Sequence, residues 1–261
     1  MDILQSFLLG LLQGLTEFLP ISSSGHLALG KYFLGENNEA GLTFEIVVHF
    51  GTLCSILIYY RALIGDILKS GVSFLAAPKE KKDDPNVKMI LFVLISMIPA
   101  FIVGFTLKDS VESIFDRPFL VSIMLVVTGF ILSLTKFAKE KDGEVTLGRS
   151  FIIGLAQAFA MIPGISRSGS TISAALYFGV KREDAANFSF LMVIPVIGGA
   201  MLLQILDLIE IGIDAVQVTS LLVGFFTAFI SGYYALKYLI VILKKKGFHY
   251  FAYYCWLVGG A

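Results

Sequence analysis

One stretch of sequence occurs twice in this chain, and the two copies keep the same spacing without a gap. The first copy reads SFLLGLLQGLTEFLPISSSG over 6–25, and the second reads SFIIGLAQAFAMIPGISRSG over 150–169. The residue numbers differ by 144 throughout, as Ser6 and Ser150 show. In each copy an apolar half-segment runs into Pro, Gly and Ser residues and is followed by another apolar segment. In a membrane chain, such a repeat predicts two broken helical hairpins that face a shared site.

The composition indicates that the chain is an integral membrane protein of helical type. Hydrophobic residues make up 56% of its 261 positions, and the mean hydropathy of +0.82 is too high for a soluble domain of this size. Crossing a hydrocarbon core of about 30 Å takes about 20 residues of helix. Stretches that approach this length occur clearly at 89–107, 119–135, 188–206 and 220–243. The stretch 44–60 is shorter, and 250–260 is marginal.

The distribution of charge predicts which loops face the cytoplasm. The formal net charge is zero, but lysine and arginine gather in alternate loops. Loops rich in these residues tend to stay on the cytoplasmic side of a membrane. The basic loops are 61–88, 136–149, 181–182 and 244–246, and the loops poor in basic residues are 31–43, 108–118 and 207–216.

This orientation makes the repeat an inverted one. Residues 1–40 approach the membrane from outside, whereas 150–180 enter from the cytoplasm and return to it. Each limb is too short to span, so we expect re-entrant hairpins surrounded by protein or by a wet cavity.

The predicted fold class is an all-α polytopic membrane protein with an inverted-topology repeat. A single integral membrane domain covers 1–261, with one repeat at about 1–135 and the other at about 145–261. Two re-entrant broken-helix hairpins, 1–30 and 150–180, accompany about six transmembrane helices, and 62–77 could be a helix on the cytoplasmic side. The six are 44–60, 88–107, 118–136, 187–206, 217–243 and 249–261.

The first hairpin carries a carboxylate at a costly position. Gln13 and Glu17 are four residues apart, so they share one face of a helix. An ionisable residue inside a membrane segment indicates a functional site. The alternative is that Glu17 extends to the interface and contacts only water.

The turn that follows, LPISSSGH, offers three hydroxyls and an imidazole. We expect at least one of Ser22, Ser23 and Ser24 to cap the next half-helix. The position of His26 permits an acid, base or nucleophilic role beside the carboxylate. His49 lies within a predicted span without polar neighbours, so we expect it to be a packed neutral residue.

The second hairpin carries an arginine in a glycine-rich turn, PGISRSGST. The guanidinium of Arg167 is permanently charged and can donate two parallel hydrogen bonds to a phosphate. Backbone amides of the turn and the side chains of Ser166, Ser168 and Thr171 add donors. Alternatively, Arg167 is a structural partner of Glu17 that joins the hairpins. Together the two tips suggest phosphate chemistry on a membrane-embedded substrate.

These motifs resemble those of the bacterial undecaprenyl pyrophosphate phosphatases of the bacitracin-resistance type. The first motif of that family falls on Gln13 and Glu17, and the serine and histidine after it fall on Ser23 and His26. Its second motif falls on Pro163, Gly164, Ser166, Arg167, Ser168 and Thr171. The length and hydropathy of the whole chain agree with the resemblance.

The resemblance implies a hydrolase that converts undecaprenyl pyrophosphate, a C55 lipid, to the monophosphate carrier and inorganic phosphate, a step that recycles the carrier for cell-wall synthesis and underlies bacitracin resistance. It also implies a divalent cation, Mg²⁺ or Ca²⁺. The expected location is the bacterial inner membrane, with the active site on the extracytoplasmic side. The expected partners are the lipid substrate and membrane lipids, a homodimer is allowed, and nucleic acid is not expected. Gln13 departs from family members that carry Glu there, which leaves Glu17 as the acidic metal ligand of the motif.

The predicted catalytic residues are Glu17, Ser23, His26 and Arg167, and the predicted substrate-binding residues are Gln13, Ser22, Ser166, Ser168 and Thr171. Glu17 acts as general base or metal ligand, and either Ser23 or His26 is the nucleophile. The rival interpretation is a transporter of lipid carriers or small anions, because inverted repeats with broken helices are typical of transporters.

Overall fold

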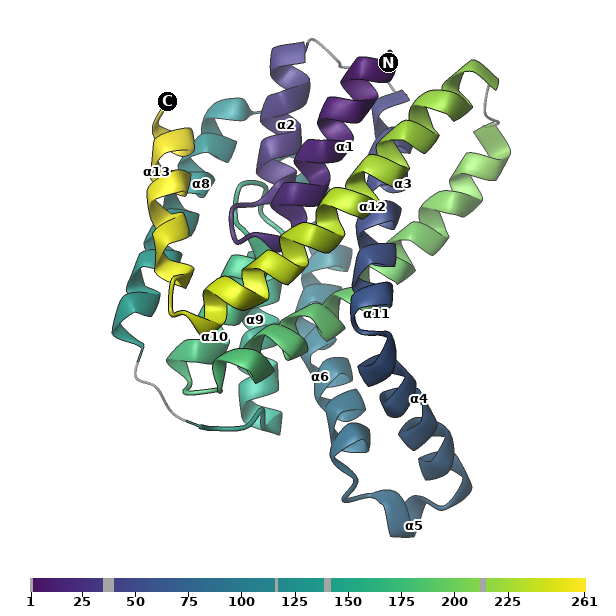
Figure 1. The fold of residues 1–261 in the computed structure, drawn as a ribbon, viewed down its shortest axis with the longest axis vertical. Helices are drawn as coiled ribbons and strands as arrows, with labels where there is room; N and C mark the ends of the chain where they lie inside the picture. The colour runs from purple at the N-terminus through teal and green to yellow at the C-terminus, as the bar shows by residue number, and fades with distance from the viewer. Residues whose placement is uncertain (1, 35–39, 116, 139–141, 212–214) are drawn as a thin grey trace.

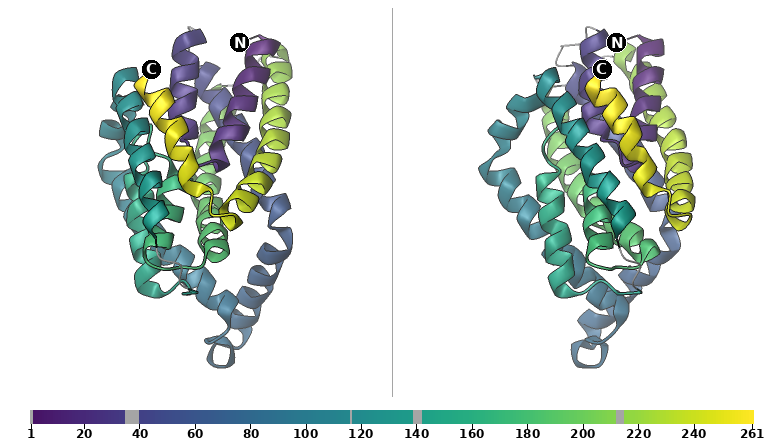
Figure 2. Two further views of the ribbon diagram at one scale, coloured as in Figure 1. Left: turned by 60° about the vertical axis from the view of Figure 1, so that its left-hand side comes forward. Right: turned by 90° about the vertical axis from the view of Figure 1, so that its left-hand side faces the viewer.

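The protein is a bundle of helices packed along one another (Figures 1 and 2). The computed structural model describes residues 2–34, 40–115, 117–138, 142–211 and 215–261. Across these ranges the regular structure is helical, apart from an isolated bridge between Gly143 and Val180. The prediction of an all-α protein is confirmed for the described residues.

Both copies of the repeat fold as helical hairpins. The first pairs α1 (Ile3–Phe18) with α2 (Ser23–Leu34), and the second pairs α9 (Leu147–Phe159) with α10 (Arg167–Tyr177). The apolar helices α1 and α9 have 16 and 13 residues. At 1.5 Å per residue they are about 24 and 20 Å long, so neither crosses a core of about 30 Å alone.

Several other helices have the length and apolarity of membrane spans. These are α6 (Pro85–Thr106), α8 (Pro118–Leu134), which η1 (Thr135–Phe137) extends, and α12 (Ala215–Lys244). A further candidate is the pair α3 (Ala40–Tyr59) and α4 (Arg61–Ala76), which is bent by 77° at the break. The chain is therefore compatible with a polytopic membrane protein.

The other two predicted spans, 187–206 and 249–261, fall on α11 (Arg182–Ile211) and α13 (Phe251–Gly260). With 10 residues, α13 is about 15 Å long and cannot cross a bilayer by itself. The count of six spanning helices stays a prediction. The remaining elements are α5 (Pro78–Lys81), α7 (Lys108–Phe115) and η2 (Phe248–Tyr250).

The two chain ends lie together at one end of the molecule, and the α4–α5 arm projects from the opposite end (Figures 1 and 2). This arm is part of the basic segment 61–88. The tips of the two hairpins lie between these ends, in the interior of the bundle (Figure 1).

Glycine allows the first helix of each hairpin to approach a helix of the other half closely. α1 packs along α12, and α9 packs along α6. A Cβ added to Gly10 would lie 2.6 Å from the carbonyl oxygen of Gly224, and one added to Gly154 would lie 2.3 Å from that of Ser96. Gly10 and Gly154 occupy the same position of the repeat. Such close backbone contact is how membrane helices gain packing energy.

Candidate active site

The first hairpin tip is shaped by Pro20 and Ser22. α1 ends at Phe18, and the chain then passes through Ser22, whose φ of +69° is unusual for a residue with a side chain. The side-chain oxygen of Ser22 accepts a hydrogen bond of 3.2 Å from the backbone N–H of Gly25 and so caps the start of α2. The expectation that one of the three serines is a cap is met by Ser22.

The second tip is anchored to α8. Gly164 has a φ of +94°, and a Cβ there would lie 2.4 Å from the carbonyl oxygen of Val121, so the turn needs glycine. The hydroxyl of Thr128 donates to the carbonyl of Gly164 at 2.9 Å and accepts from the backbone N–H of Ser166 at 3.0 Å. Ser166 in turn caps α10 by accepting from the N–H of Gly169.

The two tips touch, and their charged residues meet. The Nη2 atom of Arg167 lies 2.6 Å from Oε1 of Glu17. The hydroxyl of Ser168 donates to the backbone carbonyl of Leu19 at 3.3 Å. The tips are close enough that a Cβ on Gly25 would lie 3.1 Å from the Cα of Gly164. The predicted meeting of Glu17 with Arg167 is therefore observed.

Three further polar side chains lie close to the second carboxylate oxygen of Glu17. Its Oε2 accepts hydrogen bonds from the hydroxyl of Ser23 at 2.6 Å and from Nε2 of Gln13 at 3.0 Å. Nε2 of His49 lies 3.8 Å from the same oxygen. The expectation that His49 has no polar neighbour is wrong, because α3 packs against α1 and brings the imidazole to the carboxylate.

A cavity of about 200 Å³ lies at the meeting point of the tips. The first turns of α2 and α10 both contribute to its wall, so two helix N-termini lie at one small space. Backbone N–H groups and the helix dipole make such N-termini favourable for anions. Nη1 of Arg167 is buried and has no hydrogen-bond partner among the described residues, so it can donate to a ligand. The cavity is lined by Glu17, Ser22, Ser23, Ser24, His49, Ala160, Met161, Ile165, Ser166, Arg167 and Ile197.

His26 lies outside this lining, and both of its ring nitrogens are engaged. Nδ1 is 2.8 Å from the backbone carbonyl oxygen of Ser22, and Nε2 is 2.9 Å from the hydroxyl of Tyr254. A carbonyl can only accept, so Nδ1 carries the proton, and in the neutral ring Nε2 accepts from Tyr254. The two rings are stacked, with centroids 5.6 Å apart. In this arrangement His26 has no free nitrogen to attack a phosphorus atom.

This chemistry has counterparts among known proteins. The family model described as "Bacitracin resistance protein BacA" matches residues 6–261. The chain belongs to the BacA family. A relative from Bacteroides fragilis, named undecaprenyl-diphosphatase, is 44% identical over 263 residues, covering 99% of this chain and 96% of the relative. Relatives of the same name from Salinibacter ruber and Halothermothrix orenii are each 41% identical; they cover 98% and 99% of this chain, and 96% of each relative is covered.

Two predicted binding residues of this BacA family member make hydrogen-bond contacts within the protein. Besides donating to Leu19, the hydroxyl of Ser168 lies 3.3 Å from that of Ser166. The hydroxyl of Thr171 lies 2.9 Å from the carbonyl of Arg167 and 2.6 Å from the hydroxyl of Ser189. Neither Ser168 nor Thr171 lines the cavity, and their hydrogen bonds tie the second tip to the first tip and to α11. Their predicted role in substrate binding stays a prediction.

The residues available for a metal ion are few. Within the described ranges, no group of three or more His, Cys, Asp or Glu side chains is close enough to hold a metal. Glu17 offers the carboxylate, and Oε1 of Gln13 is buried and lacks a hydrogen-bond donor among the described residues. One carboxylate and one amide oxygen fit Mg²⁺, which often takes its remaining ligands from substrate phosphates and water.

Tyr254 is the residue of this region that the sequence did not reveal. It lies in the C-terminal apolar segment, and its contact with His26 spans 228 residues of sequence. The one available signal was the general tendency of a tyrosine in an apolar segment to find a polar partner for its hydroxyl.

Proposed function

We propose that this chain is an undecaprenyl-diphosphatase that hydrolyses undecaprenyl pyrophosphate to undecaprenyl phosphate and inorganic phosphate. The relatives from Bacteroides fragilis and Salinibacter ruber carry that name over nearly their full length. The observation that carries the proposal is the cavity between the tips, where Arg167, Glu17 and Ser23 meet at two helix N-termini. A passive transporter would not need a carboxylate that is hydrogen-bonded to a serine hydroxyl in this cavity.

The diphosphate binds at the cavity with its terminal phosphate against Arg167. Nη2 of this arginine holds Glu17, while Nη1 is left for a phosphate oxygen. The amides in the first turns of α2 and α10 add donors to the other oxygens. These donors are already oriented, so they can stabilise charge that builds up in the transition state.

Ser23 is the nucleophile in this mechanism. Glu17 Oε2 accepts the proton of the Ser23 hydroxyl, with which it is already hydrogen-bonded at 2.6 Å. The serine oxygen then attacks the terminal phosphorus, and the bond from that phosphorus to the bridging oxygen breaks. Undecaprenyl phosphate leaves with the bridging oxygen, to which Glu17 passes the proton it took from Ser23, so the carboxylate is ionised again. Glu17 then deprotonates a water that attacks the phosphoserine phosphorus; the bond from that phosphorus to the Ser23 oxygen breaks, the serine oxygen takes the proton back from Glu17, and inorganic phosphate is released.

A divalent cation, Mg²⁺ or Ca²⁺, fits this site as a companion of the substrate. Glu17 and the Oε1 of Gln13 would hold it together with phosphate oxygens, and its charge would neutralise the departing phosphate.

The architecture proposed for this function is an inverted repeat of two halves, about 1–135 and about 145–261, with α1–α2 and α9–α10 as re-entrant hairpins. The reciprocal packing of α1 on α12 and of α9 on α6 supports it. The basic α4–α5 arm would lie in the cytoplasm. The hairpin formed by α1 and α2 then enters the inner membrane from the extracytoplasmic side, to which the site opens.

The test is release of inorganic phosphate from undecaprenyl pyrophosphate by the purified full-length chain in detergent. Arg167→Ala is expected to lower kcat/KM by about 100-fold or more, as does loss of an electrostatic donor to a transition state. Arg61→Ala, on an exposed arginine at the start of α4, is the matched control and should keep wild-type turnover. Wild-type turnover in Arg167→Ala would contradict the site. No phosphate release by the wild type, with flux of substrate across liposomes, would favour the transporter.

A further inference from the structure

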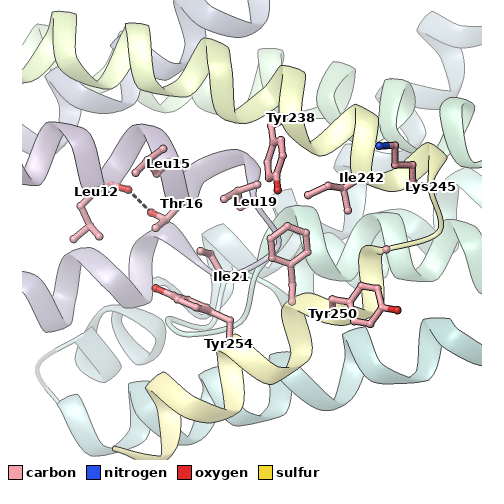
Figure 3. A pocket seen from close by; sticks show the side chains of 12 residues that line it. Leu12, Leu15, Thr16, Leu19, Ile21, Tyr238, Ile242, Lys245, Tyr250 and Tyr254 are labelled. Carbon is pink, nitrogen blue, oxygen red and sulfur yellow. Dashed lines mark hydrogen bonds between the residues drawn. The ribbon is translucent and has the colours of Figure 1, made fainter.

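A second, larger cavity lies beside the hairpin tip, on the surface of the bundle. This groove has a volume of about 700 Å³ and is bounded by α1, the end of α12 and α13 (Figure 3). Its volume falls in the range of about 300–1,000 Å³ that small-molecule sites occupy. We call it the α1–α13 groove.

The lining of the α1–α13 groove is mostly apolar, although Lys245, Tyr238 and Tyr250 also belong to it. Leu12 and Leu15 of α1, with Leu19 just after its end, lie on one side of the groove, and Ile242 lies across from them (Figure 3). Phe251 also lines the groove. The hydroxyl of Thr16 turns back to donate to the carbonyl of Leu12 at 2.7 Å, so it is satisfied within its own helix. Such a lining suits an aliphatic chain and offers little to a polar ligand.

The α1–α13 groove adjoins the catalytic tip. Thr16 and Leu19 line the groove, and Glu17 lies between them on the same helix. The carbonyl of Leu19 accepts the hydroxyl of Ser168 from the second tip. Tyr254 lines the groove with its ring, while its hydroxyl contacts His26. No residue lines both cavities, but residues adjacent in sequence line one or the other: Thr16 and Ile21 line the groove, and Glu17 and Ser22 line the phosphate cavity. The backbone of the first tip therefore lies between the two cavities.

We propose that the α1–α13 groove takes the isoprenoid chain of the substrate, starting with the units nearest the diphosphate. This inference rests on the proposed function. A cavity of about 200 Å³ accommodates phosphate groups but not a C55 chain, so the chain must leave the site between helices. The groove is a largely apolar cavity of the described residues that adjoins the first tip and opens at the surface of the bundle.

The groove contributes to catalysis by fixing the position of the isoprenoid chain. Lipid tails are as apolar as the groove, so moving an isoprenoid chain from the bilayer into it yields no hydrophobic transfer energy. What the groove provides is a fixed path that holds the first carbon of the chain, and hence the diphosphate, in register with Ser23. Misplacement of a substrate by about 1 Å can cost up to about 100-fold in rate.

The test fills the groove and compares long and short substrates. Leu15→Trp is expected to lower kcat/KM for undecaprenyl pyrophosphate by about tenfold and to leave that for dimethylallyl pyrophosphate, a C5 compound, within about twofold. Leu4→Trp is the matched control: Leu4 is an exposed leucine of the same helix, outside the groove, and should change neither value. Equal losses on both substrates, or no loss on either, would overturn the proposal.

A second measurement reports occupancy without catalysis. A photo-crosslinking amino acid at position 15, in place of Leu15, should attach radiolabelled undecaprenyl phosphate several-fold more than the same group at position 4. The difference should persist when Arg167→Ala is added, so a failure of the proposed catalytic site would not hide it. Equal labelling at the two positions would mean that the groove holds only bulk lipid.

Discussion

The Nη2 atom of Arg167 lies 2.6 Å from Oε1 of Glu17, and this contact joins two hairpin tips that are 150 residues apart in sequence. Both side chains are largely withdrawn from solvent, with exposed fractions of 19% and 5%. A buried ion pair is weak support for stability, because desolvation offsets its attraction. Its consequence here is positional, since the arginine holds the Glu17 carboxylate beside the hydroxyl of Ser23, while its own Nη1 has no partner among the described residues.

The variant Glu17→Gln distinguishes the effect of this ion pair on activity from its effect on stability. We expect activity to fall at least about 100-fold because the general base is lost. The melting temperature should also fall, because Arg167 then lacks its charged partner. The double variant Glu17→Gln/Arg167→Met should recover the melting temperature but not the activity. Measurement of phosphate release and thermal unfolding in detergent checks both, and a double variant less stable than the single one would contradict the explanation.

Ser23→Ala should abolish the covalent intermediate. Wild-type protein incubated with substrate labelled on the terminal phosphate is expected to retain label that survives acid and is lost in base, as phosphoserine does. The variant should retain none, since Ser23 is the hydroxyl bonded to Glu17. Acid-labile label that persists in Ser23→Ala would identify His26 as the nucleophile.

The sequence predicted the hairpins because their signal is local. Apolar half-segments, helix-stopping Pro20 and Gly164, and capping serines act within a few residues, and both tips form where the repeat places them. The helix at 62–77 is likewise confirmed as α4. The meeting of Glu17 with Arg167 followed from the charge bias, which set the two hairpins against each other.

The contacts of His49 and His26 could not be predicted in this way. His49 reaches Glu17 because α3 packs on α1, and Tyr254 reaches His26 from the last helix of the chain. No motif or fixed spacing in the sequence indicates either contact, because both depend on how helices distant in sequence pack against each other. Similarly, Thr171 was predicted to bind substrate from its hydroxyl and its place in the second motif, and neither signal indicated the hydrogen bond to Ser189, which depends on how α10 packs on α11.

Tyr254→Phe should impair catalysis because the imidazole of His26, which donates to the carbonyl of Ser22 in the first tip, loses its second anchor. Removing the hydroxyl leaves Nε2 without its donor, and because Tyr254 is 40% exposed the loss lies at the low end, about 1 kcal/mol. We expect kcat to fall by up to about tenfold, less than for Arg167→Ala, because Tyr254 acts only through His26. Tyr253→Phe, on an exposed neighbour of the same helix, should have no effect.

A double-mutant cycle distinguishes this role from simple packing. If Tyr254 acts through His26, the effects on kcat of Tyr254→Phe and His26→Asn should not add, because contacting residues share one interaction energy. Additive effects would mean that Tyr254 supports the site by another route.

Gly154→Ala tests the close contact that positions the second tip. A Cβ there would lie 2.3 Å from the carbonyl oxygen of Ser96, a backbone atom that cannot rotate away. We expect a loss of about 1–3 kcal/mol in unfolding free energy, typical of overpacking, together with lower activity as α9 shifts. Gly148→Ala, on the same helix, meets no atom within 4 Å and should be neutral or stabilise the helix by up to about 1 kcal/mol. Thermal unfolding of both variants checks the difference, and equal melting temperatures would mean that α6 and α9 do not pack this closely in the membrane.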